Sequence, residues 1–238
     1  EAATRAIIPL LKVGDLYVVN GEPLGLVYEI SDGGAHGKVV ALKAHRDLNL
    51  WYRTGLPYDE IHPEDPNNVG VIARSETDGQ ENMKAYKQIP DWKTHYPVAA
   101  YVSDLNDENG NPGWYLPAIK EVQAMVGWID GEVLSPDGEA GQEPSEAMKE
   151  KRKAINQLIV DNGGNEFYFY GYDVSFIIDQ TNAWEADYFN RIYTSTETDY
   201  QVHPMVFKFY LRNGWWETMH VYGDLAGSYG EVRPFLAF

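Results

Sequence analysis

The chain has 238 residues, with 36 acidic against 19 basic side chains, a net charge of −17 and no cysteine. A chain of this length can bury its own core in one elaborated domain. The acidic balance predicts that nucleic acids and anionic membranes are not partners, and the lack of cysteine excludes disulfides, thiolate metal sites and cysteine nucleophiles. No apolar run approaches the roughly 20 residues of a membrane-spanning helix.

The first residues predict where the protein works. The chain begins Glu1-Ala2-Ala3-Thr4 without an initiating methionine, as a chain does after removal of a leader. We therefore expect an extracytoplasmic protein that is secreted, periplasmic or anchored at the surface. Residues 1–12 predict an N-terminal tail, and residues 13–238 predict a single domain.

Strand signals begin just after this tail. Two strand-like runs, Leu16–Val19 and Leu24–Ile30, flank Asn20-Gly21, which accepts the positive φ angles of a two-residue hairpin turn. A third strand is expected in Lys38–Lys43. Residues 44–90 are crowded with Asp, Asn, Pro and Gly, and they predict long loops.

A first helix is expected from Pro97, because proline suits the first helical position and apolar residues follow at helical spacing through Leu105. The polar stretch after it indicates a loop. Residues 104–111 of this loop are rich in side-chain oxygen, which calcium prefers, but the glycine is misplaced for an EF-hand and a solvated turn is the favoured interpretation.

A second, central helix is expected after the stretch Gly113–Pro117, with its end at Gly127. Its apolar face is predicted to be buried and carries Ile119, Val122, Met125 and Val126. Its polar face is predicted to be in water and carries Lys120, Glu121 and Gln123.

An insertion near residues 130–161 follows the central helix. It begins with an acidic stretch rich in Gly and Pro, and it continues as a helix capped by Ser145 and terminated by Gly163-Gly164. Four basic residues of this helix are interpreted as a solvated face: Lys149, Lys151, Arg152 and Lys153.

The last third of the chain indicates β-structure. Met205–Leu211 and Trp215–Tyr222 flank Asn213-Gly214 as a second hairpin, and Glu231–Phe238 closes the chain as a strand. Strand-rich ends around a helical middle predict an α+β fold with mixed, mostly antiparallel sheets, two to three helices and long loops.

Three strings resemble one family. They are GWYLPAIKEV (113–122), YTSTE (193–197) and EVRPFLAF (231–238). In this order they are similar to a branch of the C-type-lectin-like domains, consisting of secreted bacterial domains of unknown function that are distantly similar to the variable proteins of diversity-generating retroelements. The resemblance covers residues 13–238. It implies paired terminal strands, a long loop region that presents the ligand surface, and no enzyme activity.

The motifs of common catalytic and metal sites are not met. Ala226–Gly230 resembles a relaxed nucleophile elbow around Ser228, but no histidine follows it as a hydrolase requires. The six histidines lack the spacing of a metal motif, and a zinc site assembled in three dimensions stays open. We expect no catalytic residue, no metal and no cofactor.

Aromatic residues beside acids mark the candidate binding site, because such rings stack on sugars or anchor protein contacts. Strand alternation sends half of the rings of a strand into the core. Along the late hairpin, alternation from the more apolar Met219 and Val221 places Trp215 inward and Trp216 outward. The predicted ligand-binding residues are Trp184, Asp187, Tyr188, Trp216, His220, Tyr222 and Asp224.

Two functions are therefore open. The first is a secreted or cell-surface binding module, adhesin-like and without catalytic activity, whose ligand is a glycan or a protein. The alternative is a structural subunit or cap of an extracellular assembly such as a pilus, which would use an edge strand. An ordered aromatic cleft favours the first and dimerisation through an uncovered strand favours the second; the sequence does not give the oligomeric state.

Overall fold

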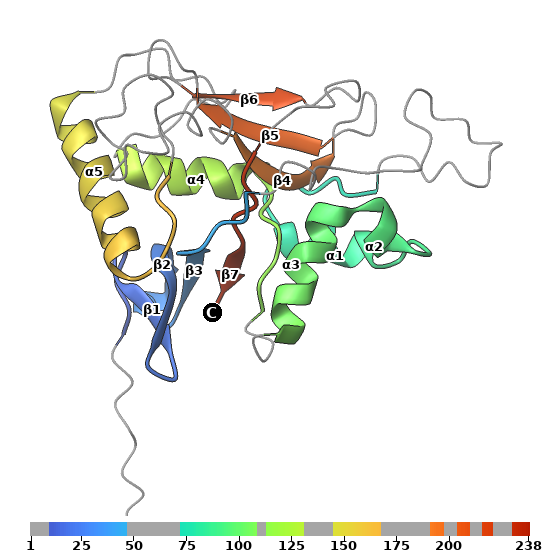
Figure 1. The fold of residues 1–238 in the computed structure, drawn as a ribbon, viewed down its shortest axis with the longest axis horizontal. Helices are drawn as coiled ribbons and strands as arrows, with labels where there is room; N and C mark the ends of the chain where they lie inside the picture. Colours follow the sequence, from blue (N-terminus) through green and yellow to red (C-terminus); the bar gives the residue numbers. More distant parts are fainter. Residues whose placement is uncertain are drawn as a thin grey trace, which may run out of the picture.

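The computed structural model describes residues 10–46, 72–108, 113–130, 145–167, 191–197, 204–209, 216–220 and 230–238 (Figure 1). These residues form an α+β fold with two antiparallel sheets and several helices, as predicted. Helix α4 (Ile119–Asp130) lies between the two sheets and contacts strands of both.

The first sheet combines the N-terminal strands with the C-terminal one. Its strands are β1 (Leu16–Val19), β2 (Glu22–Ser31), β3 (His36–Ala41) and β7 (Phe235–Ala237). They lie in the order β1-β2-β3-β7, and each neighbouring pair is antiparallel. The predicted hairpin turn is confirmed, because Asn20-Gly21 joins β1 to β2 with φ values of 53° and 85°.

The C-terminal strand joins this sheet at the third strand. β7 pairs with β3, where Val39 lies opposite Leu236. The terminal strands therefore share one sheet as predicted, but their direct pairing is wrong, because β1 pairs with β2 and β7 pairs with β3. Side chains make the contact with the first strand: Tyr17 stacks on Phe238 with ring centroids 5.4 Å apart. Gly37 leaves room for this ring, since a Cβ there would lie 2.7 Å from Phe238 Cζ.

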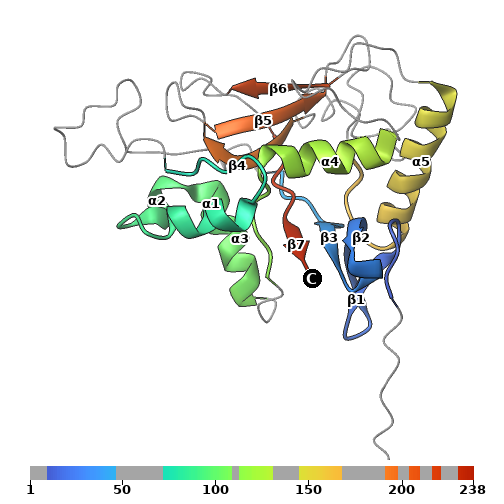
Figure 2. The same cartoon turned by 180° about the vertical axis from the view of Figure 1, so that it is seen from behind.

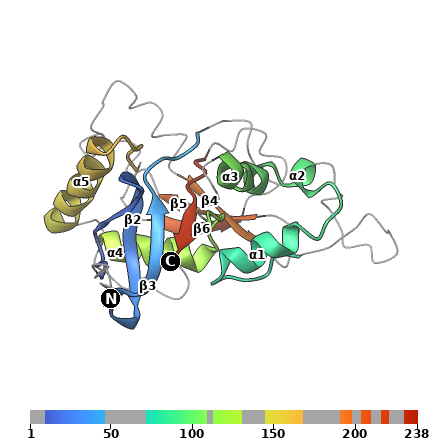
Figure 3. The same cartoon turned by 90° about the horizontal axis from the view of Figure 1, so that it is seen from below.

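The structure describes five α-helices, more than the two to three predicted. Helices α1 (Gly79–Tyr86), α2 (Trp92–His95) and α3 (Pro97–Glu108) lie together at one end of the molecule. Helix α5 (Glu146–Asp161) lies at the opposite end (Figures 2 and 3). The α3 helix begins at Pro97, as predicted.

Helix α1 falls in a segment that was predicted to be loop. Asp78 caps it by accepting a backbone N–H of the first turn at 2.9 Å. Its buried positions include Gly79 and Asn82, so the helical spacing is carried partly by residues without apolar side chains. A Cβ at Gly79 would lie 2.3 Å from the carbonyl oxygen of Leu116, which belongs to residues 113–118 just before α4, called the central turn below. This close contact admits only glycine.

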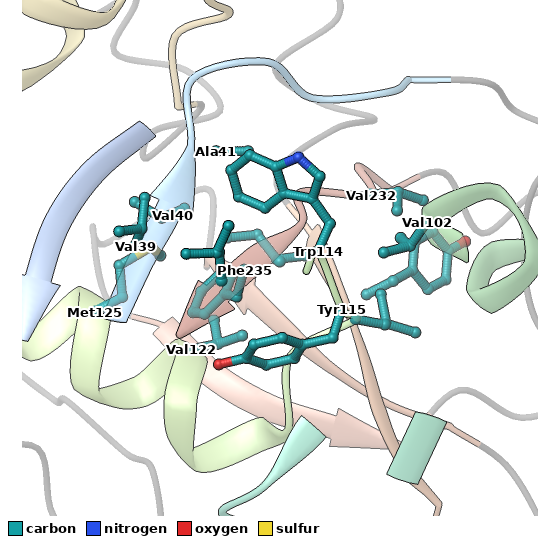
Figure 4. Packing of buried hydrophobic residues seen from close by; sticks show 14 of the residues in the cluster. Val39, Val40, Ala41, Val102, Trp114, Tyr115, Val122, Met125, Val232 and Phe235 are labelled. Atoms are coloured by element: carbon teal, nitrogen blue, oxygen red, sulfur yellow. The ribbon is translucent and has the colours of Figure 1, made fainter. Parts of the chain in front are cut away.

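The central helix α4 begins two positions after Pro117 and runs past Gly127 to Asp130. Val122 and Met125 are 0% exposed, as predicted, and Figure 4 shows them near side chains of β3 and β7. Glu121, predicted to face water, is instead only 3% exposed.

Helix α5 has both of the predicted end signals. Ser145 Oγ accepts the N–H of Met148 at 3.3 Å. Gly163, with φ 74°, and Gly164 donate to Val160 and Ile159, which is the Schellman arrangement. The solvated basic face is wrong at one position, because Arg152 is 1% exposed. It shares helical spacing with the buried residues Ile155, Asn156 and Ile159.

The second sheet contains β4 (Arg191–Glu197), β5 (Pro204–Phe209) and β6 (Trp216–His220) in that order. Both pairs are antiparallel, and Phe209 lies opposite Trp216. The second predicted hairpin is thereby confirmed in its two strands.

Candidate functional site

Most of the predicted ligand-binding residues lie outside the described residues: Trp184, Asp187, Tyr188, Tyr222 and Asp224. Trp216 and His220 occupy the two ends of β6, opposite Phe209 and Met205 of β5. Since alternate strand positions share a face, Trp216 and His220 belong to one face of the sheet. The binding site stays a prediction. The structure describes β6 and the residues that flank the segments carrying the other predicted residues.

The segments of the late chain are joined to the described residues at a few positions, which we call attachment points. Residues 168–190 join Phe167 to Arg191, and residues 221–229 join β6 to Gly230. Residues 198–203 follow Glu197, the last residue of β4. Buried polar side chains hold three of these attachment points, and each can be traced to particular contacts.

The first attachment point is Phe167. The side chain of Asn156 in α5 bonds both backbone groups of Phe167, as the backbone of a paired strand would. Asn156 Nδ2 donates to the carbonyl of Phe167 at 2.9 Å, and Asn156 Oδ1 accepts its N–H at 2.8 Å. Both residues are at most 1% exposed. A buried amide that satisfies both backbone groups of one residue fixes the point where the long segment begins.

The second attachment point is a buried ionic cluster at residues 231–233. Arg233 is 0% exposed, donates to Glu231 Oε1 at 2.8 Å and lies 4.0 Å from the ring centroid of Phe167. Arg46 donates to the other carboxylate oxygen of Glu231 at 3.2 Å. The remaining donors of Arg233 reach the carbonyls of Ala41, Leu42, Asn165 and Glu166. One guanidinium thus joins β3, the segment after α5 and the C-terminal strand.

The third attachment point is the end of β4. Glu197 Oε2 accepts the backbone N–H of Ile72 at 2.9 Å and of Ala73 at 3.1 Å. The N–H of Glu197 donates to the carbonyl of Ala73 at 2.9 Å. The carboxylate therefore anchors an otherwise irregular segment before α1.

The hydroxyl residues of β4 connect the same segment to the central turn. Ser195 Oγ accepts from Asn82 Nδ2 at 3.0 Å, and its N–H donates to the carbonyl of Pro117 at 2.7 Å. Thr196 Oγ1 accepts the first N–H of α4, that of Ile119, at 3.0 Å and donates to the carbonyl of Ser75 at 2.9 Å. The YTSTE string thus serves as a cap for α4 and a junction between three segments.

Glu121 is the corresponding junction inside α4. One carboxylate oxygen accepts the N–H of Gly79 at 3.0 Å and that of Ala118 at 2.9 Å. The other accepts the hydroxyl of Tyr115 at 2.8 Å and pairs with Lys38 Nζ at 2.9 Å. Burial, and then the neighbouring Glu121 carboxylate, raise the pKa of Tyr115 far above its ordinary value.

These buried polar residues are what the sequence reasoning missed. The polar side chains of Asn82, Glu121, Asn156 and Arg233 favour exposure to water, so their burial has no local signal in the sequence. The available signal was the three strings of the family resemblance. GWYLPAIKEV, YTSTE and EVRPFLAF supply most of these contacts, and in the structure they hold segments together.

The oxygen-rich loop predicted over residues 104–111 is in part helix, since α3 continues to Glu108. Asn106 turns back and accepts the N–H of Trp114 at 2.7 Å, which places it as a cap for the central turn. Lys93 pairs with Asp104, and this hydrogen bond raises the pKa of Lys93. Within the described residues, no group of three His, Cys, Asp or Glu side chains is placed to hold a metal. Ser228 lies outside them.

Among the helices of the described part of the chain, none has both the length and the apolar character needed to cross a membrane. No protein-family model matches the sequence, and no curated protein matches it significantly. The fold is similar to the crystal structure of a fimbrial protein from Bacteroides ovatus ATCC 8483, with a TM-score of 0.54 and 14% sequence identity. The match covers 96% of this chain and 49% of the fimbrial protein, so the chain spans about half the length of that structure. At this identity the likeness is one of fold.

Proposed function

We propose that this protein is a cell-surface module of a fimbria-like extracellular assembly. The observation that carries the proposal is the match of nearly the whole chain, 96%, to a fimbrial protein at a TM-score of 0.54. The same likeness to a fimbrial protein supports an extracytoplasmic location. The module has no catalytic role.

The domain proposed for this role is C-type-lectin-like. Three features support it: the C-terminal strand returns to the N-terminal sheet, a second antiparallel sheet lies on the other side of α4, and the family strings meet in the interior. In such a domain a long loop region presents the ligand surface, while the strings maintain the fold.

The test is to locate the protein on the cells that produce it. Antibodies against the purified chain, detected by immunogold electron microscopy, should label filaments at the cell surface, and sheared filament preparations should contain the chain. Labelling confined to the cell interior, or to a surface without any association with filaments, would contradict the proposal.

A second role, ligand binding, is favoured by the way the late segments are mounted. Binding residues commonly lie on loops positioned by a rigid scaffold. Here Phe167, Glu197 and Glu231 are each 5% exposed or less and held by buried hydrogen bonds, next to segments rich in Trp, Tyr and Asp. The ligand would be a glycan or a protein at the surface. A glycan array probed with the intact chain tests this role, and the absence of binding to any glycan would leave only protein ligands.

A further inference from the structure

The outer edge of β1 is an open strand edge. In the part of the chain that the structure describes, β1 pairs with β2 alone, and no other strand lies on its outer side. The opposite edge of the same sheet is occupied, because β7 forms a bridge from Phe235 to Tyr115 of the central turn. The β1–β2 hairpin lies far from β6 in both side views (Figures 1 and 2).

The register identifies the backbone groups that this edge presents. Val19 and Glu22 flank the two-residue turn and form the hydrogen-bonded pair of the hairpin. The next pair, Val18 and Pro23, is then of the type that exchanges no hydrogen bonds, in keeping with the missing N–H of proline. The N–H and C=O of Val18 therefore point outward. The N–H of Val27 donates to the carbonyl of Asp15, so the next pair, Leu16 and Leu26, is again of the type that exchanges no hydrogen bonds. The N–H and C=O of Leu16 therefore also point outward.

The edge also has little of the usual protection against pairing. Natural edge strands carry charged side chains, prolines or bulges that discourage a further strand. The β1 strand reads Leu-Tyr-Val-Val, without a charge or a proline. Its single irregularity lies between Tyr17 and Val18.

Exposed apolar side chains lie on this strand and in the chain near it. The large hydrophobic residues of the described chain that are exposed all lie between residues 10 and 30: Leu10 at 63%, Val13 at 39%, Val18 at 51% and Ile30 at 38%. Val18 belongs to β1 itself and Val13 to the residues just before it, so exposed apolar side chains that a partner could cover lie at this edge.

The negative charge around the β1–β2 hairpin favours a basic partner. Exposed charged residues of this region are Lys12, Asp15, Glu22, Glu29 and Asp32. One cation against four acids would repel a second copy of the same hairpin and would attract a basic segment.

We propose that the β1 edge binds an extended segment of another polypeptide by strand addition, and that this segment has apolar residues at alternate positions and basic residues at its flanks. Main-chain hydrogen bonds to Leu16 and Val18 would supply the affinity, and the apolar side chains around them would supply the fit. The inference rests on the proposed function in one respect: the segment comes from a neighbouring subunit of the assembly.

The test uses the intact chain and a short fluorescent peptide of alternating valine and threonine with lysines at both ends. Its twin carries glutamates in place of the lysines. In anisotropy titrations the lysine peptide should bind at least about tenfold more tightly than the glutamate peptide. Hydrogen exchange of residues 16–19 in the unaltered protein should slow when the lysine peptide is added.

Two substitutions at one position separate backbone pairing from simple apolar contact. Val18→Pro removes an outward N–H without removing a bond to β2, so it should weaken peptide binding at least about tenfold while the thermal unfolding curve stays in place. Val18→Thr keeps the N–H and the branched shape, and it should stay within about threefold of the unaltered protein.

Three outcomes would overturn the inference: no binding of the lysine peptide, equal binding by Val18→Pro, or a dimer in light scattering that Val18→Pro abolishes, which would show a second copy on the edge. If Val18→Pro does not fold, the exchange measurement on the unaltered protein decides. A failed titration leaves the filament labelling intact, and unlabelled filaments leave the titration intact, so the two proposals fail separately.

Discussion

Asn82 and Ser195 are 113 residues apart in the sequence, and their buried side chains share a hydrogen bond of 3.0 Å. The same amide of Asn82 also closes two bonds with the backbone of Ser75, at 2.9 and 2.7 Å. Through these contacts α1 is attached to the second sheet. A single side chain thus joins a helix that has little apolar surface to the strand that caps α4.

Replacing Asn82 by alanine should lower the free energy of unfolding by about 1–3 kcal/mol, because it leaves buried partners at Ser75 and Ser195 without hydrogen bonds. Urea denaturation measures the change. Gln157→Ala is the control, since Gln157 is exposed and donates to Asp161 of its own helix. Equal stability of the two variants would argue against a structural role for Asn82.

Replacing Arg233 by methionine should cost about 3–5 kcal/mol, because the buried Glu231 then loses the salt bridge from Arg233 and retains the one from Arg46. The measurement is again the free energy of unfolding. Lys153→Met removes the same charge from an exposed position of α5 and should cost about 0.5 kcal/mol or less. An Arg233→Met protein as stable as the original would show that packing alone holds this junction.

Stability should fall above pH 10, and Tyr115 should be one cause. Its pKa is raised in the folded protein from the ordinary value of 10.0, so the unfolded chain loses this proton first as the pH rises. Its contribution is fully present below pH 10 and decreases above it, by about 1.4 kcal/mol per pH unit. Tyr115→Phe should be less stable at pH 8, through loss of the bond to Glu121, and should show a shallower decline between pH 10 and 11. Parallel declines in the two proteins would contradict this cause.

Met125→Ala should cost about 2–5 kcal/mol, because Met125 is 0% exposed between the two sheets and its truncation leaves a cavity. Lys120→Ala, on the same helix with the lysine side chain 50% exposed, should change stability by less than about 1 kcal/mol. Hydrogen exchange should place α4 among the most protected elements. Rapid exchange of its amides would show that the fold is organised elsewhere.

Trp216→Ala tests the predicted binding surface. Once a ligand is known, the variant should lose its binding while the melting temperature stays nearly unchanged, as expected for an outward ring on β6. Trp215→Ala is the matched variant at the neighbouring position, and it should instead lower the melting temperature. The reverse pattern would mean that the predicted faces of this strand are exchanged.

Local chemistry allowed several elements to be predicted from the sequence. Asn20-Gly21 forms its turn, Pro97 begins α3, Ser145 caps α5 and Gly163 ends it, because each depends on φ preferences and hydrogen bonds within a few residues. The burial of Val122 and Met125 followed from helical spacing. The α+β class followed from the order of these signals.

Tertiary structure alone decided the burial of Glu121, the extra helices, and the strand beside β7. Glu121 looks like a solvent-facing residue in the sequence, and it is buried because its four partners come from β3, the central turn and α1. Likewise β7 pairs with the edge of β3 that β2 leaves free, and which edge is free depends on the pairing of β1, β2 and β3. Buried polar groups and strand partners depend on donors and edges brought from distant parts of the chain, and no short stretch of sequence records them.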